Sequence, residues 1–253
     1  SEMCIRDRSY TGKAVSPAPA VTYGGKKLVK NTDYTVSYSK NTAIGQASVK
    51  ITGKGLYKGT KTVNFNIRPA TVTKLKVSST GEKSVKLSWK KVTGADSYAI
   101  YRYDSTSKKW QRIKTVKAVS FTDSGLARAK GYSYKVKAVK KSGGKEYISA
   151  SYSKAIEAVT KPAKASCTAK SAGSGSIEVS WKAVGGASGY EIYSSSNGSD
   201  YVKSAKVGGS QKSAIVSGFE PYSLRMVKVR AYKTVNGKTS YGAFSQAVMV
   251  IVR

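Results

Sequence analysis

The chain has 253 residues, with 45 Lys or Arg, 13 Asp or Glu, two cysteines and no histidine. Without histidine, a Ser-His-Asp or Cys-His relay and a histidine-ligated metal are excluded. The net charge of +32 favours contact with polyanions. The longest apolar run, Ala247–Val252, has six residues, far fewer than the roughly 18 that span a bilayer, so membrane insertion is not expected.

The first eight residues, SEMCIRDR, lack both the alternating pattern and the Lys/Ser/Thr/Tyr-rich composition that begin at Ser9. This octapeptide resembles the translation of a transposase adaptor used in sequencing libraries. We therefore predict that residues 1–8 are adaptor-derived, with a disordered native terminus as the alternative, and leave them out of the fold prediction. On the adaptor interpretation, Cys167 is the single cysteine of the natural protein, no intrachain disulfide forms, and the gene continues upstream of Ser9.

From Ser9 onward, short segments alternate apolar and polar residues and are bounded by Gly, Asn, Asp and Ser. Val85–Trp89 and Tyr134–Ala138 are clear examples. This pattern is typical of half-buried antiparallel strands. No segment keeps an apolar period of 3.6 residues over three helical turns, so the chain is predicted to be all-β.

Residues 9–69 form a first unit with its own signature, carried by Tyr10–Lys13, Asp33–Tyr38 and Gly53–Thr60. The unit resembles the short immunoglobulin-like surface repeats found in tandem in Gram-positive secreted proteins. Because its start is close to the adaptor junction, we expect that an opening strand is missing and that a sheet edge is left unpaired.

An internal repeat divides the rest of the chain. Two pairs of segments match, at offsets of 92 and 93 residues: 89–101 with 181–193, and 136–138 with 229–231. A repeat of this length with a buried tryptophan has the size of a β-sandwich. Proline-containing hinges at Arg68–Ala70 and Thr160–Ala163 mark the boundaries, because proline cannot donate to a sheet ladder.

The two repeat copies, 70–162 and 163–253, share a set of aromatic positions: Trp89 and Trp181, and Tyr98 with Tyr101 and Tyr190 with Tyr193; the first copy also has a step from Leu126 to Tyr132. On these residues the two copies resemble bacterial fibronectin type III domains. In the second copy Arg225 stands where Tyr132 should recur, with Phe219 at the leucine position. The resemblance implies a corner hydrogen bond from that tyrosine, so we expect a looser corner in the second copy. The predicted fold is three tandem small β-sandwich domains of immunoglobulin-like and fibronectin type III type.

Motifs that suggest catalysis do not fit their context. Gly53-x-Gly55-x-x-x-Gly59 is one residue too long for a dinucleotide loop and no helical pattern follows it, so we interpret it as a turn between strands. Ser37–Lys40 and Ser151–Lys154 match S-x-x-K, but both lie in strand pattern, where residues three apart point to opposite faces. We predict a non-enzymatic protein with no catalytic, cofactor-binding or metal-binding residues.

The chain has 18 Tyr and 3 Trp, which raises the alternative of a platform that stacks sugars or bases. Most of these aromatic residues fall on inward positions of the alternation. Trp110 follows two lysines, and we interpret it as covering a sheet edge. Cys167 precedes a strand and is interpreted as a structural thiol, not a nucleophile.

The positive charge is spread over all three units, with +9 in 9–69, +15 in 70–162 and +8 in 163–253. Lysines outnumber arginines 36 to 9, and lysine is poorly suited to bidentate base readout, so specific nucleic-acid recognition is not expected. Outward lysines also keep exposed strand edges from pairing with other chains. The functional alternative is weak, multivalent contact with anionic cell-wall polymer or acidic glycan, with Lys135, Lys137, Lys140 and Lys141 as the candidate contacts.

The resemblances imply a monomeric segment of a larger bacterial protein, located outside the cell or on its surface, whose modules act as non-catalytic spacers and interaction domains. Two alternatives stay open. The segment could be the accessory part of a secreted polysaccharide hydrolase or peptidase whose catalytic domain lies upstream of Ser9. It could instead be a polyanion- or cell-wall-binding adhesin.

Overall fold

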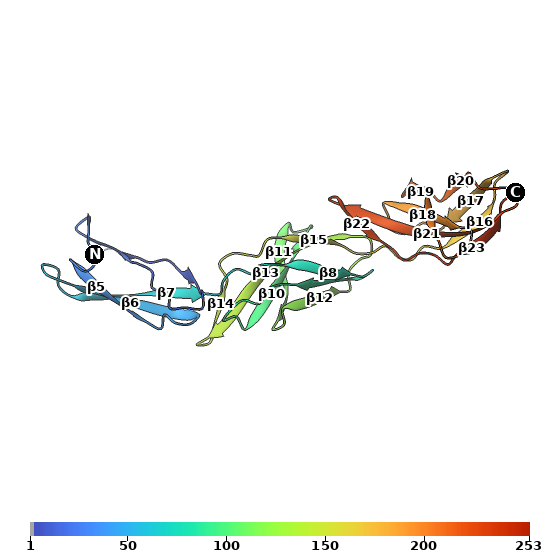
Figure 1. The fold of residues 1–253 in the computed structure, drawn as a ribbon. Coiled ribbons are helices and arrows are strands. Elements are labelled where there is room, and N and C mark those ends of the chain that lie inside the picture. The colour runs from blue at the N-terminus through green and yellow to red at the C-terminus, as the bar shows by residue number, and fades with distance from the viewer. Residues whose placement is uncertain (1–2) are drawn as a thin grey trace. The chain divides into compact units, whose positions relative to one another are not determined.

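The computed structural model describes residues 3–253, with side chains from Ile5 onward, and Figure 1 shows its ribbon. Every regular element in this range is a β-strand, so the all-β prediction is confirmed. No helix in the described range has the length and apolarity that crossing a bilayer would need. The chain forms two compact units: one holds the residues up to Lys76 with 88–121 and 134–156, and the other holds 77–87, 122–133 and 157–253. These divisions differ from the predicted domain boundaries, which stay a prediction.

The first sandwich consists of a three-stranded and a four-stranded sheet. The three-stranded sheet has the order β1 (Met3–Cys4), β3 (Ala20–Tyr23) and β4 (Lys26–Lys27). The four-stranded sheet has the order β2 (Arg8–Ser9), β7 (Thr60–Arg68), β6 (Gly45–Gly53) and β5 (Tyr34–Ser39). Val21 from the first sheet and Val49 and Ile51 from the second share one buried cluster, so alternating apolar residues close the sandwich.

The residues before Tyr10 take part in this sandwich. Met3–Cys4 pair antiparallel with β3, and Arg8–Ser9 pair in parallel with the end of β7. Asp7 accepts a hydrogen bond from the backbone N–H of Asn66 at 2.9 Å and pairs with Arg68 Nε at 2.7 Å. Burial raises the pKa of Asp7, but the bonds from Asn66 and Arg68 outweigh it and the net pKa is lowered. These contacts give residues 3–9 partners in the sandwich, and the alternative of a disordered native terminus stays a prediction that has not been tested. Their adaptor origin stays a prediction, because a foreign segment can also add to an open sheet edge.

The next two sheets hold the first repeat copy. One has the order β12 (Ser120–Ser124), β9 (Ser84–Ser88) and β8 (Lys76–Thr80). The other has the order β11 (Lys109–Val116), β10 (Ser97–Asp104), β13 (Gly131–Ser142) and β14 (Lys145–Ile148), with β15 (Ile156–Val159) also pairing with β13. Both sheets contribute fully buried residues, among them Leu87 on β9, Ile100 on β10 and Val136 on β13.

The second copy repeats this plan. One sheet has the order β16 (Cys167–Ser171), β17 (Ser176–Trp181) and β20 (Ser213–Ser217). The other has the order β19 (Val202–Gly208), β18 (Gly189–Ser195), β21 (Leu224–Val235) and β22 (Lys238–Tyr241), with β23 (Val248–Ile251) pairing with β21. One core cluster joins the two sheets, with Ile177 and Val179 on one side and Ile192 and Val229 on the other.

The sequence repeat is exact enough to preserve local irregularities. The register between β10 and β11 shifts at Ile100/Tyr101, and that between β18 and β19 shifts at the matching Ile192/Tyr193. In each copy a tryptophan that is 6% exposed packs on a buried tyrosine whose hydroxyl accepts a backbone N–H. The ring centres of Trp89 and Tyr98 lie 5.4 Å apart, and those of Trp181 and Tyr190 lie 5.1 Å apart. The hydroxyl of Tyr98 accepts the N–H of Val92, and the hydroxyl of Tyr190 accepts the N–H of Val184. The prediction that both tryptophans belong to the core is confirmed.

The corner between sheets differs between the copies as the sequence predicts. In the first copy the hydroxyl of Tyr132 accepts the backbone N–H of Ala127 at 2.8 Å. In the second copy Arg225 places its guanidinium 5.0 Å from the ring centre of Phe219. Its buried Nε has no hydrogen-bond partner among the described residues. At this corner the second copy thus has a cation–π contact between Arg225 and Phe219 in place of the hydrogen bond from Ala127 to Tyr132. That the second corner is looser stays a prediction.

The prediction of strand geometry across Ser151–Lys154 is wrong. β14 ends at Ile148 and β15 begins at Ile156, and the connection between them is irregular. Ser153 satisfies the backbone of Val136 on β13 in place of a neighbouring strand. Its Oγ accepts the N–H of Val136 at 3.0 Å, and its own N–H donates to Val136 O at 2.9 Å. Ser245 accepts the N–H of Val229 in the same way in the second copy. These two serines therefore act as structural hydrogen-bond acceptors.

Candidate functional site

The four lysines that sequence reasoning singles out have two different environments. Lys135 and Lys137 lie two residues apart on β13, and their ammonium groups both approach the Tyr152 ring, at 5.3 and 4.3 Å from its centre. Lys140 forms an ion pair with Asp96 at 2.9 Å, and its hydrogen bond is the main cause that lowers the pKa of that carboxyl. Lys141 approaches Asp96 through its backbone N–H. The structure therefore places Lys135 and Lys137 beside Tyr152, and Lys140 and the backbone of Lys141 beside Asp96.

Rings and cations alternate along the outer face of β13. Lys135 Nζ lies 4.3 Å from the Trp110 ring centre, and Lys137 also donates to the carbonyl of Ala150. We call the row Trp110, Lys135, Tyr152 and Lys137 the first ladder. Burial, and secondarily the charge of Arg68, lower the pKa of Lys137. Trp110 stands on the edge strand β11, so its predicted place at a sheet edge is confirmed.

A second ladder runs along β21 in the second copy. Lys228 Nζ lies 3.5 Å from the Tyr201 ring centre and 4.5 Å from that of Phe244. The Arg230 guanidinium lies 4.8 Å from Phe244 and 4.1 Å from Tyr241. A cation over an aromatic face contributes about 0.5–1 kcal/mol at exposed sites and more where water is excluded. The same row in both copies favours a structural role for Lys135 and Lys137.

One carboxylate is buried beneath the second ladder. Glu191, whose side chain is 2% exposed, accepts two hydrogen bonds from Arg230, at 2.7 and 2.9 Å, and one from Lys203 at 3.3 Å. The hydroxyl of Tyr193 donates to the same group at 3.3 Å. Burial raises the pKa of Glu191, but Arg230 and then Lys203 outweigh it, so the net pKa is lowered. This carboxylate is ionised and surrounded by donors, which suits an internal anchor better than a general base.

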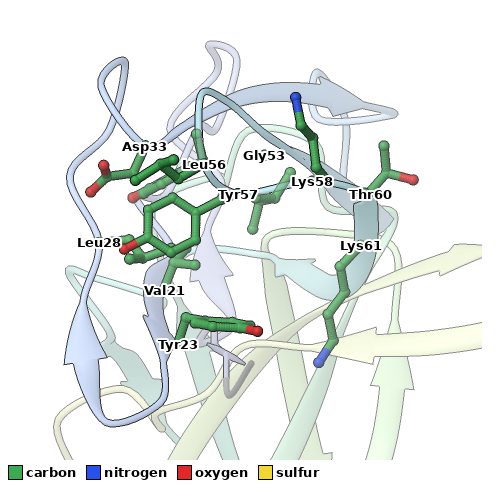
Figure 2. A pocket seen from close by; sticks show the side chains of 13 residues that line it. Val21, Tyr23, Leu28, Asp33, Gly53, Leu56, Tyr57, Lys58, Thr60 and Lys61 are labelled. Atoms are coloured by element: carbon green, nitrogen blue, oxygen red, sulfur yellow. The ribbon is translucent and has the colours of Figure 1, made fainter.

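The first sandwich carries an open hollow of about 640 Å³, shown in Figure 2. Its apolar lining includes Val21, Leu28 and Ile51, which belong to the buried cluster between the two sheets. The rings of Tyr23 and Tyr57 meet edge to face, with centres 5.7 Å apart, on one side of the hollow, and Lys61 lies on the other.

The glycine motif between β6 and β7 builds the rim of this hollow. A Cβ on Gly53 would lie 2.5 Å from the carbonyl oxygen of Tyr57, so only glycine lets the loop approach the strand so closely. Gly55 and Gly59 have φ values of +63° and +92°, which favour glycine. The interpretation of this motif as a turn between strands is confirmed. The backbone N–H groups of Gly53 and Tyr57 donate to Gly59 O and Lys54 O, so neither points at a phosphate.

Sequence reasoning did not identify this hollow. Its aromatic and basic lining residues are scattered over residues 9–69: Tyr23, Tyr34, Tyr57, Lys58 and Lys61. The available signal was the glycine spacing, which marks a loop folded tightly onto its own strand. Within residues 3–253, no group of three or more His, Cys, Asp or Glu side chains is placed to hold a metal ion.

Comparisons with known proteins find partial similarity. No protein-family model matches the chain. One segment is 40% identical over 100 residues to a poly(3-hydroxybutyrate) depolymerase of Ralstonia pickettii; the match covers 40% of this chain and 18% of that enzyme. Among solved structures, a two-domain fibronectin type III segment of chicken tenascin has a TM-score of 0.42 at 19% identity, covering 73% of this chain and 98% of that one. The FN1–FN3 domains of chicken CNTN1 have a TM-score of 0.39 at 16% identity, covering 82% and 76%.

Proposed function

We propose that the chain supplies non-catalytic β-sandwich modules, acting as spacers and interaction domains, to a secreted or cell-surface bacterial protein. The observation that carries this proposal is the recurrence of the ladder on both repeat copies. In each copy the outward cations and rings pack on one another, and the buried carboxylate of the second copy is held by Arg230 and Lys203. Such surfaces stiffen a module without presenting a reactive group.

On this proposal residues 70–162 and 163–253 are fibronectin type III domains, and residues 9–69 are an immunoglobulin-like surface repeat. The chain spans 18% of the depolymerase that it matches, and the matched length of 100 residues is close to that of one repeat copy. That match favours a second candidate function, an accessory part of a secreted hydrolase. A third, an adhesin for anionic wall polymer or acidic glycan, draws on the net charge of +32.

Long-read sequencing across the Ser9 junction in the source DNA separates the first two candidates. A reading frame that continues upstream into further β-sandwich modules supports the spacer role. A frame that continues into a hydrolase or peptidase domain makes the segment an accessory arm. If the codons for Met3–Ile5 prove genomic, the adaptor prediction is wrong.

Retention on an anionic wall-polymer matrix tests the third candidate. Exchange of Lys135 and Lys137 to Gln should weaken retention at low salt, and added salt should release the unmodified chain. Exchange of Lys140, which Asp96 already neutralises, is the matched control and should have a smaller effect.

A further inference from the structure

We propose that the hollow in the first sandwich binds a carboxylate-bearing sugar, a hexuronic acid residue of an acidic polysaccharide. This inference names a ligand class for the proposed interaction role and rests on it. The volume of about 640 Å³ lies within the range of roughly 300–1,000 Å³ typical of small-molecule sites. The site lies entirely within the sandwich of β1–β7 and needs no other part of the chain.

The aromatic side of the hollow suits the ring of a pyranose. Tyr23 is 61% exposed although it lies beside a buried cluster, and its ring meets Tyr57 at an interplanar angle of 73°. Two rings set as a corner present one face and one edge to the same space (Figure 2). The C–H groups of a sugar are attracted to the negative face of an aromatic ring, while its hydroxyls stay free for polar partners.

The polar side of the hollow suits a carboxylate. Lys58 and Lys61 line the rim, and the unit of residues 9–69 carries ten basic residues and one acidic residue. That acidic residue, Asp33, also lines the hollow, and one of its oxygens accepts the N–H of Val29 at 2.8 Å. A carboxylate has about four acceptor positions, so Asp33 can still accept a hydrogen bond from a sugar hydroxyl.

The rim is held in place before any ligand arrives. Lys54 N–H donates to Asp33 O at 2.8 Å, and Gly53 N–H donates to Gly59 O at 3.0 Å, which ties both ends of the loop to the sandwich. At the tip of this loop Leu56 is 95% exposed. A held loop reduces the ordering cost of binding. The loop N–H groups of Gly53 and Tyr57 already have backbone acceptors, so these two donors are not available to an anion.

The test is an NMR titration of the full chain with a trimer of galacturonic acid, alongside the fully methyl-esterified trimer, which has the same rings without the charge. We expect the acid to cause saturable amide chemical-shift changes that are confined to residues 21–34 and 51–61. We expect the ester to bind at least tenfold more weakly. Equal binding of both trimers, shifts elsewhere, or no shift at 10 mM acid would overturn the proposal.

Variants locate the site. Tyr23→Ala removes an exposed ring, so it should leave the fold intact and weaken binding of the acid at least tenfold. The double exchange Lys58→Gln with Lys61→Gln should abolish the preference for acid over ester. Lys26→Gln is the matched control, since Lys26 lies nearby on β4 but does not line the hollow. An equal loss in the control would mean that general charge, not the hollow, binds the sugar. That result would overturn the proposed sugar site. It would not affect the proposed spacer role, which is tested by the sequence of the gene upstream of Ser9.

Discussion

Removing the carboxylate of Glu191 should destabilise the second repeat copy by about 3 kcal/mol. Breaking a buried ion pair by deleting one partner costs about 3–5 kcal/mol, because the remaining charge is left uncompensated. The side chains of Arg230 and Lys203 are 22% and 49% exposed, so water can partly solvate both after Glu191→Ala. We therefore expect the lower end of that range.

The first copy supplies the rescue variant. At the positions of Glu191 and Arg230 it has Ala99 and Lys137, and its fold accommodates that pair without a buried carboxylate. The double variant Glu191→Ala with Arg230→Lys should therefore regain most of the lost stability and stay within about 1 kcal/mol of the parent. The comparison is a double-mutant cycle whose interaction term measures the coupling between the two residues.

Hydrogen exchange measured by mass spectrometry on the full chain is the assay. Amides of β18 and β21 report the second copy, while those of β10 and β13 serve as an internal reference in the same molecule. A loss of about 3 kcal/mol corresponds to roughly 150-fold faster exchange in β18 and β21. Acceleration below about fivefold in the single variant, or no recovery in the double variant, would refute the anchor role of Glu191.

Three further predictions follow from contacts in the repeat copies. The pKa of Glu191 is lower in the folded than in the unfolded chain, so the stability that its carboxylate contributes should be complete above the unfolded pKa of about 4.3 and be lost as pH falls through the folded pKa. The hydrogen-exchange rates of the parent and of Glu191→Gln should therefore converge at low pH. Ser153→Ala leaves the buried N–H of Val136 without its hydroxyl acceptor and should cost about 1–3 kcal/mol in urea unfolding. Tyr132→Phe removes the hydroxyl that accepts the N–H of Ala127 and should lower the stability of the first copy by about 1 kcal/mol. Arg225→Tyr should raise the melting temperature of the second copy, because it replaces an unpaired buried Nε with the tyrosine of the first copy; a lower melting temperature would contradict this argument.

The sheets could be predicted from the sequence because alternation and repetition are local signals. The offset of 92 residues even carries the register shift at Tyr101 over to Tyr193. The segment around Ser153 could not be predicted, because its sequence alternates as in a strand although it forms none. There the Ser153 hydroxyl, and not a second strand, accepts the N–H of Val136. The pairing of residues 3–9 was also missed, since an edge strand needs a partner edge and not a pattern of its own.

The hollow could not be predicted because it depends on contacts between distant segments. Tyr23 and Tyr57 are far apart in the sequence, and they meet because Gly53 lets the following loop fold back onto β6. The glycine spacing and the lack of a following helix already argue against a phosphate loop. The structure adds that the N–H groups of Gly53 and Tyr57 donate to Gly59 O and Lys54 O.

The distribution of charge separates the two kinds of surface in this chain. On the repeat copies, Lys135 and Lys228 lie over aromatic rings, so part of the charge excess is tied to the fold and net charge alone does not identify a ligand site. On the first sandwich, Lys58 and Lys61 line a hollow that also contains exposed aromatic surface. Residues 9–69 carry a smaller net charge than residues 70–162, yet they form a hollow that is lined by cations, aromatic rings and a carboxylate. For this protein, the neighbours of each lysine are therefore a better guide to ligand binding than the number of lysines.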